Sequence, residues 1–257
     1  MIIPIATLTL FRFDGIANRL WVIGQMGAAR FGLRGERRAL FWKLCGSGTG
    51  QGFTPKPNWG VWAILATWPD EATARDAVAT SPVFSRWRAR ACESWTVFLA
   101  PTSARGSWAG VNPFQPCDPT PDTIMAPDAF KTSDAFKAPG PIVALTRATV
   151  RPSRALRFWN RVPDISAVIG ADPNVAFKIG IGEVPLLHQV TFSVWPDAAS
   201  MASFARGNGP HGRAIAAVRS GNWFAEELYA RFALLGSAGR WEGGDPLSRL
   251  TTEKDAA

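Results

Sequence analysis

Two stretches of the chain decide its fold: Trp59-Gly-Val-Trp-Ala-Ile-Leu-Ala-Thr-Trp-Pro-Asp70 and Leu187-His-Gln-Val-Thr-Phe-Ser-Val-Trp-Pro-Asp197. Each is a mostly apolar run that ends in Trp-Pro-Asp. The first tryptophan of that tripeptide is Trp68 in one copy and Trp195 in the other, 127 residues later in a chain of 257. A repeat of this kind governs the whole architecture, because each copy is expected to build the same unit.

The same order of elements is predicted around both copies. Apolar runs predict strands, and an aspartate after such a run is typical of a helix N-cap. The first half is predicted to hold a strand over 5–13, a helix over 15–29 capped by Asp14, strands over 40–45 and 59–68, a helix from Asp70 broken at Pro82, and a strand over 94–100. The second half is predicted to hold a strand over 141–151, a helix over 152–160, strands over 175–181 and 187–195, a helix from Asp197, a helical segment over 210–219, and a last helical turn and strand within 224–235.

This βαββαβ order is that of a ferredoxin-like unit, whose antiparallel sheet has helices on one face only. Two such units each leave a bare apolar face, and packing these faces together buries both. We therefore predict an α+β protein in which two ferredoxin-like βαββαβ repeats pack sheet to sheet as an intrachain dimeric α/β barrel. The halves are 1–100 and 141–236. Between them, 101–140 carries seven prolines and is predicted as a linker or extended wrap, and 237–257 as a polar, frayed tail.

Shorter sequence similarities between the two halves, which we call echoes, favour duplication of one ancestral half. They pair Arg19-Leu-Trp21 with Arg157-Phe-Trp159, Phe41-Trp-Lys-Leu44 with Ala176-Phe-Lys-Ile179, and Phe98 with Phe232 at an offset of 134.

Composition limits the partners. The net charge of +8 attracts acidic proteins or anionic lipid headgroups, whereas the scattered arginines argue against nucleic acid. Three cysteines are too few for a disulfide framework or a zinc site. No uncharged run reaches the roughly 18 residues of a spanning helix, and no signal peptide is recognisable, so we expect a cytoplasmic protein. Twelve tryptophans indicate a large apolar core or pocket.

One predicted strand has an unusually bare face. Side chains alternate along Phe177-Lys-Ile-Gly-Ile-Gly-Glu183, so Lys178, Gly180 and Gly182 share one side. Such a face suits the close approach of a ligand. A bulge or an edge position explains a strand glycine equally well.

Histidines are scarce, and only His188 and His211 are present. His211 stands where the first half has Val83, on a predicted helix face with Ile215 and Val218, and is a candidate metal or haem ligand. A core or capping histidine is the alternative. His188, on a strand face with Val190, is a second candidate ligand or a hydrogen-bonded core histidine.

Cys45 precedes the glycine-rich run 46–52 and matches Gly180 in the alignment of the halves. It is a conceivable thiolate ligand, although a buried structural cysteine is the commoner case.

Several long runs resemble the spheroidene monooxygenase family, the carotenoid ketolases of purple bacteria. They include Phe41-Trp-Lys-Leu-Cys-Gly-Ser-Gly-Thr-Gly50, Pro57-Asn-Trp-Gly60, Phe177-Lys-Ile-Gly-Ile-Gly-Glu-Val-Pro185, His188-Gln-Val-Thr-Phe192 and Glu226-Glu-Leu-Tyr229.

The resemblance implies a haem-containing oxygenase that uses dioxygen and reduced ferredoxin to place a keto group at C-2 of an acyclic carotenoid such as spheroidene. By this resemblance His211 is the expected axial ligand, and Lys178, Lys43 or Arg213 pair with the haem propionates. Gly180 and Gly182 would flank the haem. An apolar carotenoid substrate and an acidic ferredoxin suit the tryptophans and the positive charge, and a lipid-dissolved substrate suggests peripheral contact with the inner or intracytoplasmic membrane. A non-catalytic binder of haem or apolar ligands, and an oxygenase for another lipid, are the alternatives.

Overall fold

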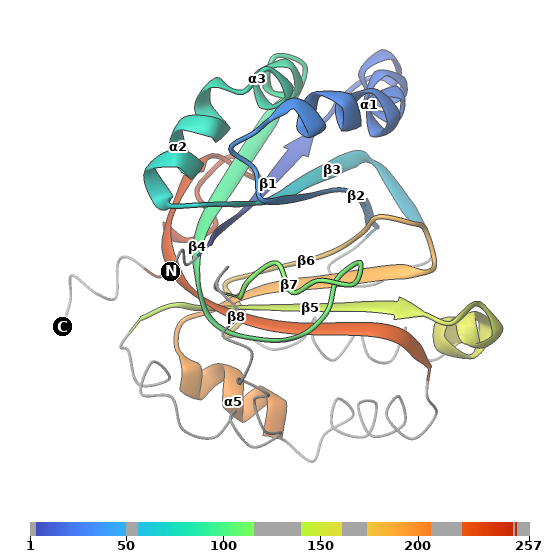
Figure 1. Cartoon of the computed structure of the whole chain (residues 1–257), viewed down its shortest axis with the longest axis vertical. Helices are drawn as coiled ribbons and strands as arrows, with labels where there is room; N and C mark the ends of the chain where they lie inside the picture. The colour runs from blue at the N-terminus through green and yellow to red at the C-terminus, as the bar shows by residue number, and fades with distance from the viewer. Residues whose placement is uncertain are drawn as a thin grey trace.

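The computed structural model describes residues 4–49, 56–115, 140–160, 174–206, 223–248 and 250. In these residues eight strands form one closed antiparallel barrel (Figure 1). The strands are β1 (Ile5–Arg12), β2 (Phe41–Gly48), β3 (Pro57–Trp68), β4 (Glu93–Gly106), β5 (Ile142–Val150), β6 (Phe177–Gly182), β7 (His188–Trp195) and β8 (Phe224–Gly239). The predicted α+β class and the barrel are confirmed.

The strands run around the barrel in the order β1-β3-β2-β6-β7-β5-β8-β4. Strands β1–β4 form one contiguous set, the N-terminal half, and β5–β8 form the other, the C-terminal half. In both sets the first strand lies between the third and the fourth, and the second lies beyond the third. Hydrogen bonds between β2 and β6 and between β4 and β8 join the sets, so the two sheets form one continuous wall.

Helices α1 (Ile16–Gly35), α2 (Glu71–Thr80) and α3 (Pro82–Arg88) cover the outer face of the N-terminal half (Figure 1). On the opposite side, α5 (Ala198–Arg206) lies against β7. The short 3-10 helix η3 (Pro152–Arg154) leads into a helical run that reaches residue 160. The barrel therefore has helices on its outside on both sides.

The two Trp-Pro-Asp sequences start helices as predicted. The side chain of Asp70 accepts a hydrogen bond from the backbone N–H of Thr73 at 2.8 Å, and Asp197 accepts one from the N–H of Ser200 at 2.7 Å. A carboxylate here satisfies a backbone donor that has no partner within the helix. The predicted cap at Asp14 was wrong, because α1 begins after Gly15 and has no side-chain cap.

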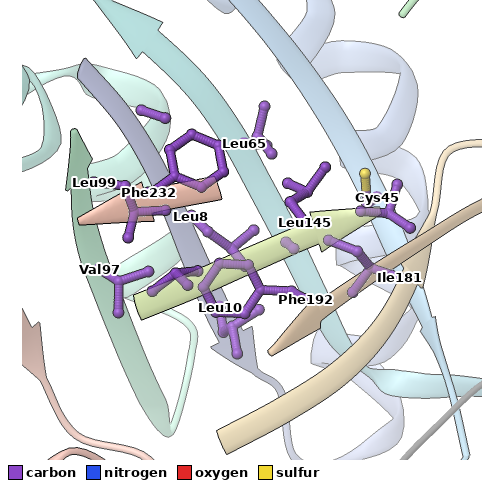
Figure 2. Close-up of a cluster of buried hydrophobic side chains, with 14 of the residues drawn as sticks. Leu8, Leu10, Cys45, Leu65, Val97, Leu99, Leu145, Ile181, Phe192 and Phe232 are labelled. Atoms are coloured by element: carbon purple, nitrogen blue, oxygen red, sulfur yellow. The ribbon is translucent and has the colours of Figure 1, made fainter. Parts of the chain in front are cut away.

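The interior of the barrel is a core of interlocking side chains. Alternate residues of each strand point inward, and an eight-stranded barrel is just narrow enough for them to fill it. Figure 2 shows apolar side chains from strands of both halves converging on this core. Its labelled members are Leu8, Leu10, Cys45, Leu65, Val97, Leu99, Leu145, Ile181, Phe192 and Phe232.

A tryptophan closes one end of the barrel. Trp108 follows β4, and its buried ring faces the guanidinium of Arg147 on β5, with 5.6 Å between the guanidinium carbon and the ring centroid. Arg147 pairs with Glu226 of β8. That carboxylate also accepts hydrogen bonds from the backbone N–H groups of Ala109 (3.2 Å) and Gly110 (2.8 Å). The chain after β4 thus closes the end of the C-terminal half.

A second tryptophan closes the opposite end by the same contacts. Trp241 follows β8, and the guanidinium carbon of Arg12 on β1 lies 4.6 Å from its ring centroid. Arg12 pairs with Glu93 of β4 at 3.3 Å. Glu93 accepts hydrogen bonds from the N–H groups of Glu242 (3.1 Å) and Gly243 (2.8 Å). We call these two groups the tryptophan plugs; each half is closed by the extension of the other half.

The plugs correct two predictions. Residues 101–115 were expected to belong to an unpacked linker, but β4 continues to Gly106, and Trp108 and Phe114 are buried in the core. The tail was expected to be polar and frayed from 237, but β8 continues to Gly239, and Trp241 and Leu247 are also in the core. Strand β8 contains no helical turn.

The register of β4 against β8 also corrects one echo. The two strands pair symmetrically, so that positions 133 residues apart correspond, and not those 134 apart. Phe98 therefore corresponds to Arg231 and lies in the outer-face core under the helices, whereas Phe232 points into the barrel. A slip of one residue moves a strand side chain to the other face of a sheet.

Candidate functional site

The residues predicted for the site fall in different parts of the molecule. His211 and Arg213 lie outside the described residues. The others are divided between the outer wall of the C-terminal half (Lys178, Gly180 and Gly182) and the barrel interior (Lys43 and His188).

The predicted alternation along β6 is confirmed. Phe177, Ile179 and Ile181 pack in the interior core, which places Lys178 and Gly180 on the outer wall. Gly182 has a structural explanation, because a Cβ atom at this position would collide with the backbone carbonyl oxygen of His188. Of the two glycines, only Gly180 remains as evidence for a ligand.

Gly180 belongs to a contiguous surface that crosses all four strands of the C-terminal half. One row of paired residues runs Gly180, Thr191, Thr146 and Tyr229 across β6, β7, β5 and β8. The neighbouring row runs Lys178, Ser193, Ala144 and Arg231. We call these eight residues the C-terminal outer face. They are small or polar, apart from Tyr229 and the apolar stems of the two cations.

The corresponding rows of the N-terminal half have the same pairing but a different composition. They run Leu44, Ile64, Thr9 and Thr96, and then Trp42, Ala66, Thr7 and Phe98. Leu44, Ile64 and Phe98 are buried in a core cluster with α1, α2 and α3. We call these eight residues the N-terminal outer face.

The C-terminal outer face therefore has smaller side chains at several matched positions, whereas Tyr229 is larger than its counterpart Thr96. Leu44 is answered by Gly180, Ile64 by Thr191, Trp42 by Lys178 and Phe98 by Arg231. This register corrects the alignment of Cys45 with Gly180, which was one residue out. Interiors are packed to near-crystalline density, so other groups, from the chain or from a ligand, have to fill the space above these smaller side chains.

Two cations border the C-terminal outer face. Lys178 on β6 and Arg231 on β8 lie in the same row, at its two edges. Burial lowers the pKa of the Arg231 guanidinium, so this cation is partly removed from water. Partly desolvated cations bind carboxylates more strongly than fully hydrated ones do.

Lys43 is not part of this surface. It points into the barrel, where its Nζ lies 2.9 Å from Oε1 of Glu183. The other carboxylate oxygen of Glu183 accepts a hydrogen bond from Nε1 of Trp108 at 2.7 Å. Lys43 and Lys178 therefore lie on opposite faces of the wall, so the same haem could not pair with both of them.

His188 also points into the barrel. Its Nδ1 lies 3.3 Å from Oε2 of Glu183, and its strand neighbour Val190 is buried in the core. His188 is a partly buried histidine that lies close to a carboxylate. In the part of the chain that the structure describes, no group of three or more His, Cys, Asp or Glu side chains could hold a metal ion.

The carboxylate of the first plug is held strongly as an anion. Burial alone would raise the pKa of Glu226, but hydrogen bonds from the backbone of Gly110, the hydroxyl of Ser107, the backbone of Ala109 and the side chain of Arg147 outweigh it and lower the pKa to about 2. This network and the plug tryptophans make the barrel mouth a structural closure.

Cys45 lies in the interior core, fully buried. Burial, reinforced by the nearby Glu183 carboxylate, raises the pKa of its thiol. A fully buried position in the packed interior is typical of a structural cysteine.

The C-terminal outer face fits a haem in two respects. The small side chains at Gly180 and Thr191 would allow a large planar group to approach the sheet closely, and Lys178 and Arg231 could pair with its two carboxylates. The face carries no histidine or cysteine, and its hydroxyl-bearing Tyr229 donates a hydrogen bond to Glu227 at 2.7 Å. The eight residues of this face therefore offer no imidazole or thiolate ligand for iron.

Sequence reasoning did not identify most of this surface. Thr146, Thr191 and Arg231 are ordinary strand residues until the register places them on the same face as Gly180. A comparison of the two halves, strand by strand, would have found them if the offset of each strand had been known.

Comparison with curated proteins finds close relatives. The chain is 54% identical over 257 residues to spheroidene monooxygenase of Rhodobacter capsulatus, covering 99% of this chain and 100% of the relative. It is 56% identical over 249 residues to the protein of that name from Cereibacter sphaeroides, covering 96% and 72%. A third, from Rubrivivax gelatinosus, is 35% identical over 227 residues, covering 88% and 81%. No family model matches the sequence.

Solved structures support the fold alone. Two aldoxime dehydratase structures match with TM-scores of 0.58 and 0.54 at 10% and 11% identity, covering 96% and 90% of this chain and 85% and 81% of theirs. The sequence identity to these relatives shows that the chain belongs to the spheroidene monooxygenase family and is a monooxygenase.

Proposed function

We propose that the protein is a haem-dependent ketolase that introduces a keto group at C-2 of an acyclic carotenoid such as spheroidene, using dioxygen and electrons from reduced ferredoxin. The observation that supports this proposal is the missing volume of the C-terminal outer face relative to the N-terminal one. The barrel interior is filled, and the N-terminal outer face is covered by packed helices. The C-terminal outer face is the described surface with a composition suited to a large cofactor.

The residues that would hold haem follow from this surface. Gly180, Thr191 and Thr146 form its floor, and Lys178 and Arg231 pair with the propionates. The chain has two histidines, and His188 is turned into the barrel beside Glu183. His211 is therefore proposed as the axial ligand.

Arg213, two residues from His211, is proposed as a further partner of a propionate. When bound, the haem would supply activation of dioxygen for hydroxylation of a C–H bond.

The overall chemistry is two hydroxylations of one carbon followed by dehydration. Each hydroxylation consumes one dioxygen, two electrons and two protons, inserts one oxygen atom into a C–H bond, and releases one water. The carbon then carries two hydroxyl groups, and it loses one molecule of water to give the ketone. The hydroxyls of Thr146 and Thr191 can donate hydrogen bonds to polar atoms bound above Gly180. A net charge of +8 would steer an acidic ferredoxin to the protein.

We further propose that the two halves arose by duplication and then diverged. The shared strand order and the two tryptophan plugs support this origin. On this view the N-terminal half is the supporting half, and the C-terminal half bears the single haem.

The test is the absorption spectrum of the purified protein with pyridine-haem quantification, for the wild type, His211→Ala and His188→Ala. We expect a Soret band in the wild type and in His188→Ala, and its loss in His211→Ala. A wild type without haem, or loss only in His188→Ala, would contradict the proposal. Carotenoid profiles of cells with and without the protein then separate a ketolase from a binding protein, because only a ketolase changes the content of 2-keto carotenoids.

A further inference from the structure

Helix α1 presents an apolar stripe to solvent. Ile16, Leu20, Ile23 and Phe31 have exposed fractions of 78%, 64%, 39% and 75%. At 100° per residue these positions lie within about 80° of one another, on a single side of the helix. The stripe is roughly 22 Å long at 1.5 Å per residue.

The stripe is separate from the face that holds α1 in the fold. Val22, Ala29 and Leu33 are buried in the N-terminal outer-face core. They lie on the opposite side of the helix from Leu20 and Phe31. Packing therefore fixes the rotation of α1, and the apolar stripe is held outward. Figure 1 shows α1 as an outer layer of the molecule, with the strands of the N-terminal half beneath it.

The other exposed positions of α1 are as informative as the stripe. They contain alanine, glycine and arginine, and neither an acidic nor a neutral polar side chain: Ala17, Arg19, Gly24, Gly27, Ala28, Arg30, Gly32, Arg34 and Gly35. An apolar stripe bordered by cations, with no acidic residue, is the signature of a helix that lies in a membrane interface.

We propose that α1 docks the protein on the surface of an anionic lipid bilayer, with Ile16, Leu20, Ile23 and Phe31 inserted at the headgroup boundary and the arginines contacting lipid phosphates. Charge complementarity selects this occupant. A second copy of the chain would bring arginines against arginines. An acidic protein would neutralise the arginines, but this pairing would not explain the exposed apolar stripe. No helix in the described part of the chain is long and apolar enough to cross a bilayer.

The experiment is flotation of the full-length protein with vesicles of phosphatidylcholine containing phosphatidylglycerol, and with vesicles of phosphatidylcholine alone. We expect the wild type to float with the anionic vesicles. Leu20→Ser/Phe31→Ser should weaken partitioning at least about tenfold, because two large apolar side chains no longer enter the interface. Arg30→Gln/Arg34→Gln should weaken it by about tenfold or more on anionic vesicles and little on neutral ones.

The matched control is Leu156→Ser/Val111→Ser, which removes two exposed apolar side chains elsewhere (exposed fractions 76% and 52%) and should leave flotation unchanged. All substituted positions are exposed, so unchanged thermal unfolding confirms that each variant is folded.

Three results would overturn the docking surface. They are no flotation of the wild type, equal flotation of Leu20→Ser/Phe31→Ser, or a wild-type dimer in light scattering that this variant converts to a monomer. Vesicle binding requires neither haem nor turnover. A negative vesicle experiment therefore does not contradict the proposed ketolase activity, and a negative haem or carotenoid experiment does not contradict the docking surface.

Discussion

The two outer faces of the barrel have the same strand order and differ in the side chains that they carry. In the N-terminal half, Leu44, Ile64 and Phe98 pack beneath three helices, and the face is part of a core. In the C-terminal half the matched residues are Gly180, Thr191 and Arg231. The same strand order therefore supports a stabilising face on one side and a candidate binding surface on the other, and the two faces differ in their side chains.

The largest effect is expected from giving the C-terminal face the residues of the N-terminal one. Gly180→Leu/Thr191→Ile refills the missing volume, so haem content per protein should fall at least about tenfold while the barrel stays folded. Pyridine-haem quantification and circular dichroism measure the two outcomes.

The control for this variant is Ala79→Leu on the exposed side of α2, which should keep its haem. Full haem content in Gly180→Leu/Thr191→Ile would place the cofactor elsewhere.

The converse change should affect stability and leave haem alone. Phe11 is buried against Phe84 and Trp87, and the register matches it with Ala148 in the C-terminal half. Phe11→Ala should lower the free energy of unfolding by about 4 kcal/mol, because the helices over this face keep a cavity.

Urea unfolding measures this loss. Haem per folded protein should not change, and a parallel loss of haem would show that the two faces are not independent.

The plugs allow the two ends to be compared through pH. The pKa of Glu226 is lowered in the folded protein to about 2, so its ionised form stabilises the fold above the ordinary carboxyl pKa of 4.5 and this contribution is lost as the pH falls from there towards 2. Glu226→Gln should cost about 3 kcal/mol at pH 7, since it leaves the buried Arg147 with only the more distant carboxylate of Glu183, 3.8 Å away.

The difference between the wild type and Glu226→Gln should shrink as urea unfolding is repeated between pH 4.5 and 2.5. Glu93→Gln at the other end should cost only about 1 kcal/mol, because Arg12 is more exposed than Arg147 (31% against 2%). Equal costs at both ends would show that burial of the arginine does not set the strength of a plug.

The smallest effect is expected at the edge of the C-terminal face. Lys178→Gln should weaken haem retention by about fivefold, as expected for loss of one partly solvated charge pair. Competition with apomyoglobin measures haem release. Lys43→Gln is the control, because Lys43 lies inside the barrel, and it should release haem at the wild-type rate.

The sequence predicted what local chemistry determines. Asp70 and Asp197 start helices because a carboxylate there satisfies nearby backbone donors, and the alternation of Phe177 and Lys178 follows from the strand itself. Offsets between the halves could not be read reliably, because each strand has its own offset and an error of one residue exchanges inside for outside. This is why Cys45 was matched with Gly180, and Phe98 with Phe232.

The closure of the barrel ends by residues that are distant in the sequence could not be predicted from the sequence either. Pro101 suggested the start of a linker, yet β4 continues past it through a register shift between Pro101 and Ser103. The partnership of Arg147 with Trp108 and Glu226 exists only once β5, β8 and the chain after β4 meet. The candidate surface has the same origin, since Gly180, Thr146 and Arg231 come onto one face only in the assembled sheet.

The tryptophan plugs amount to an exchange of lids within one polypeptide. Trp108 belongs to the first half of the chain and seals the second, and Trp241 belongs to the second and seals the first. Neither half has a finished end of its own, so neither can be a separate folding unit. A break in the backbone between residues 115 and 140 would leave two fragments that hold each other shut, and separating them would require opening both ends of the barrel together.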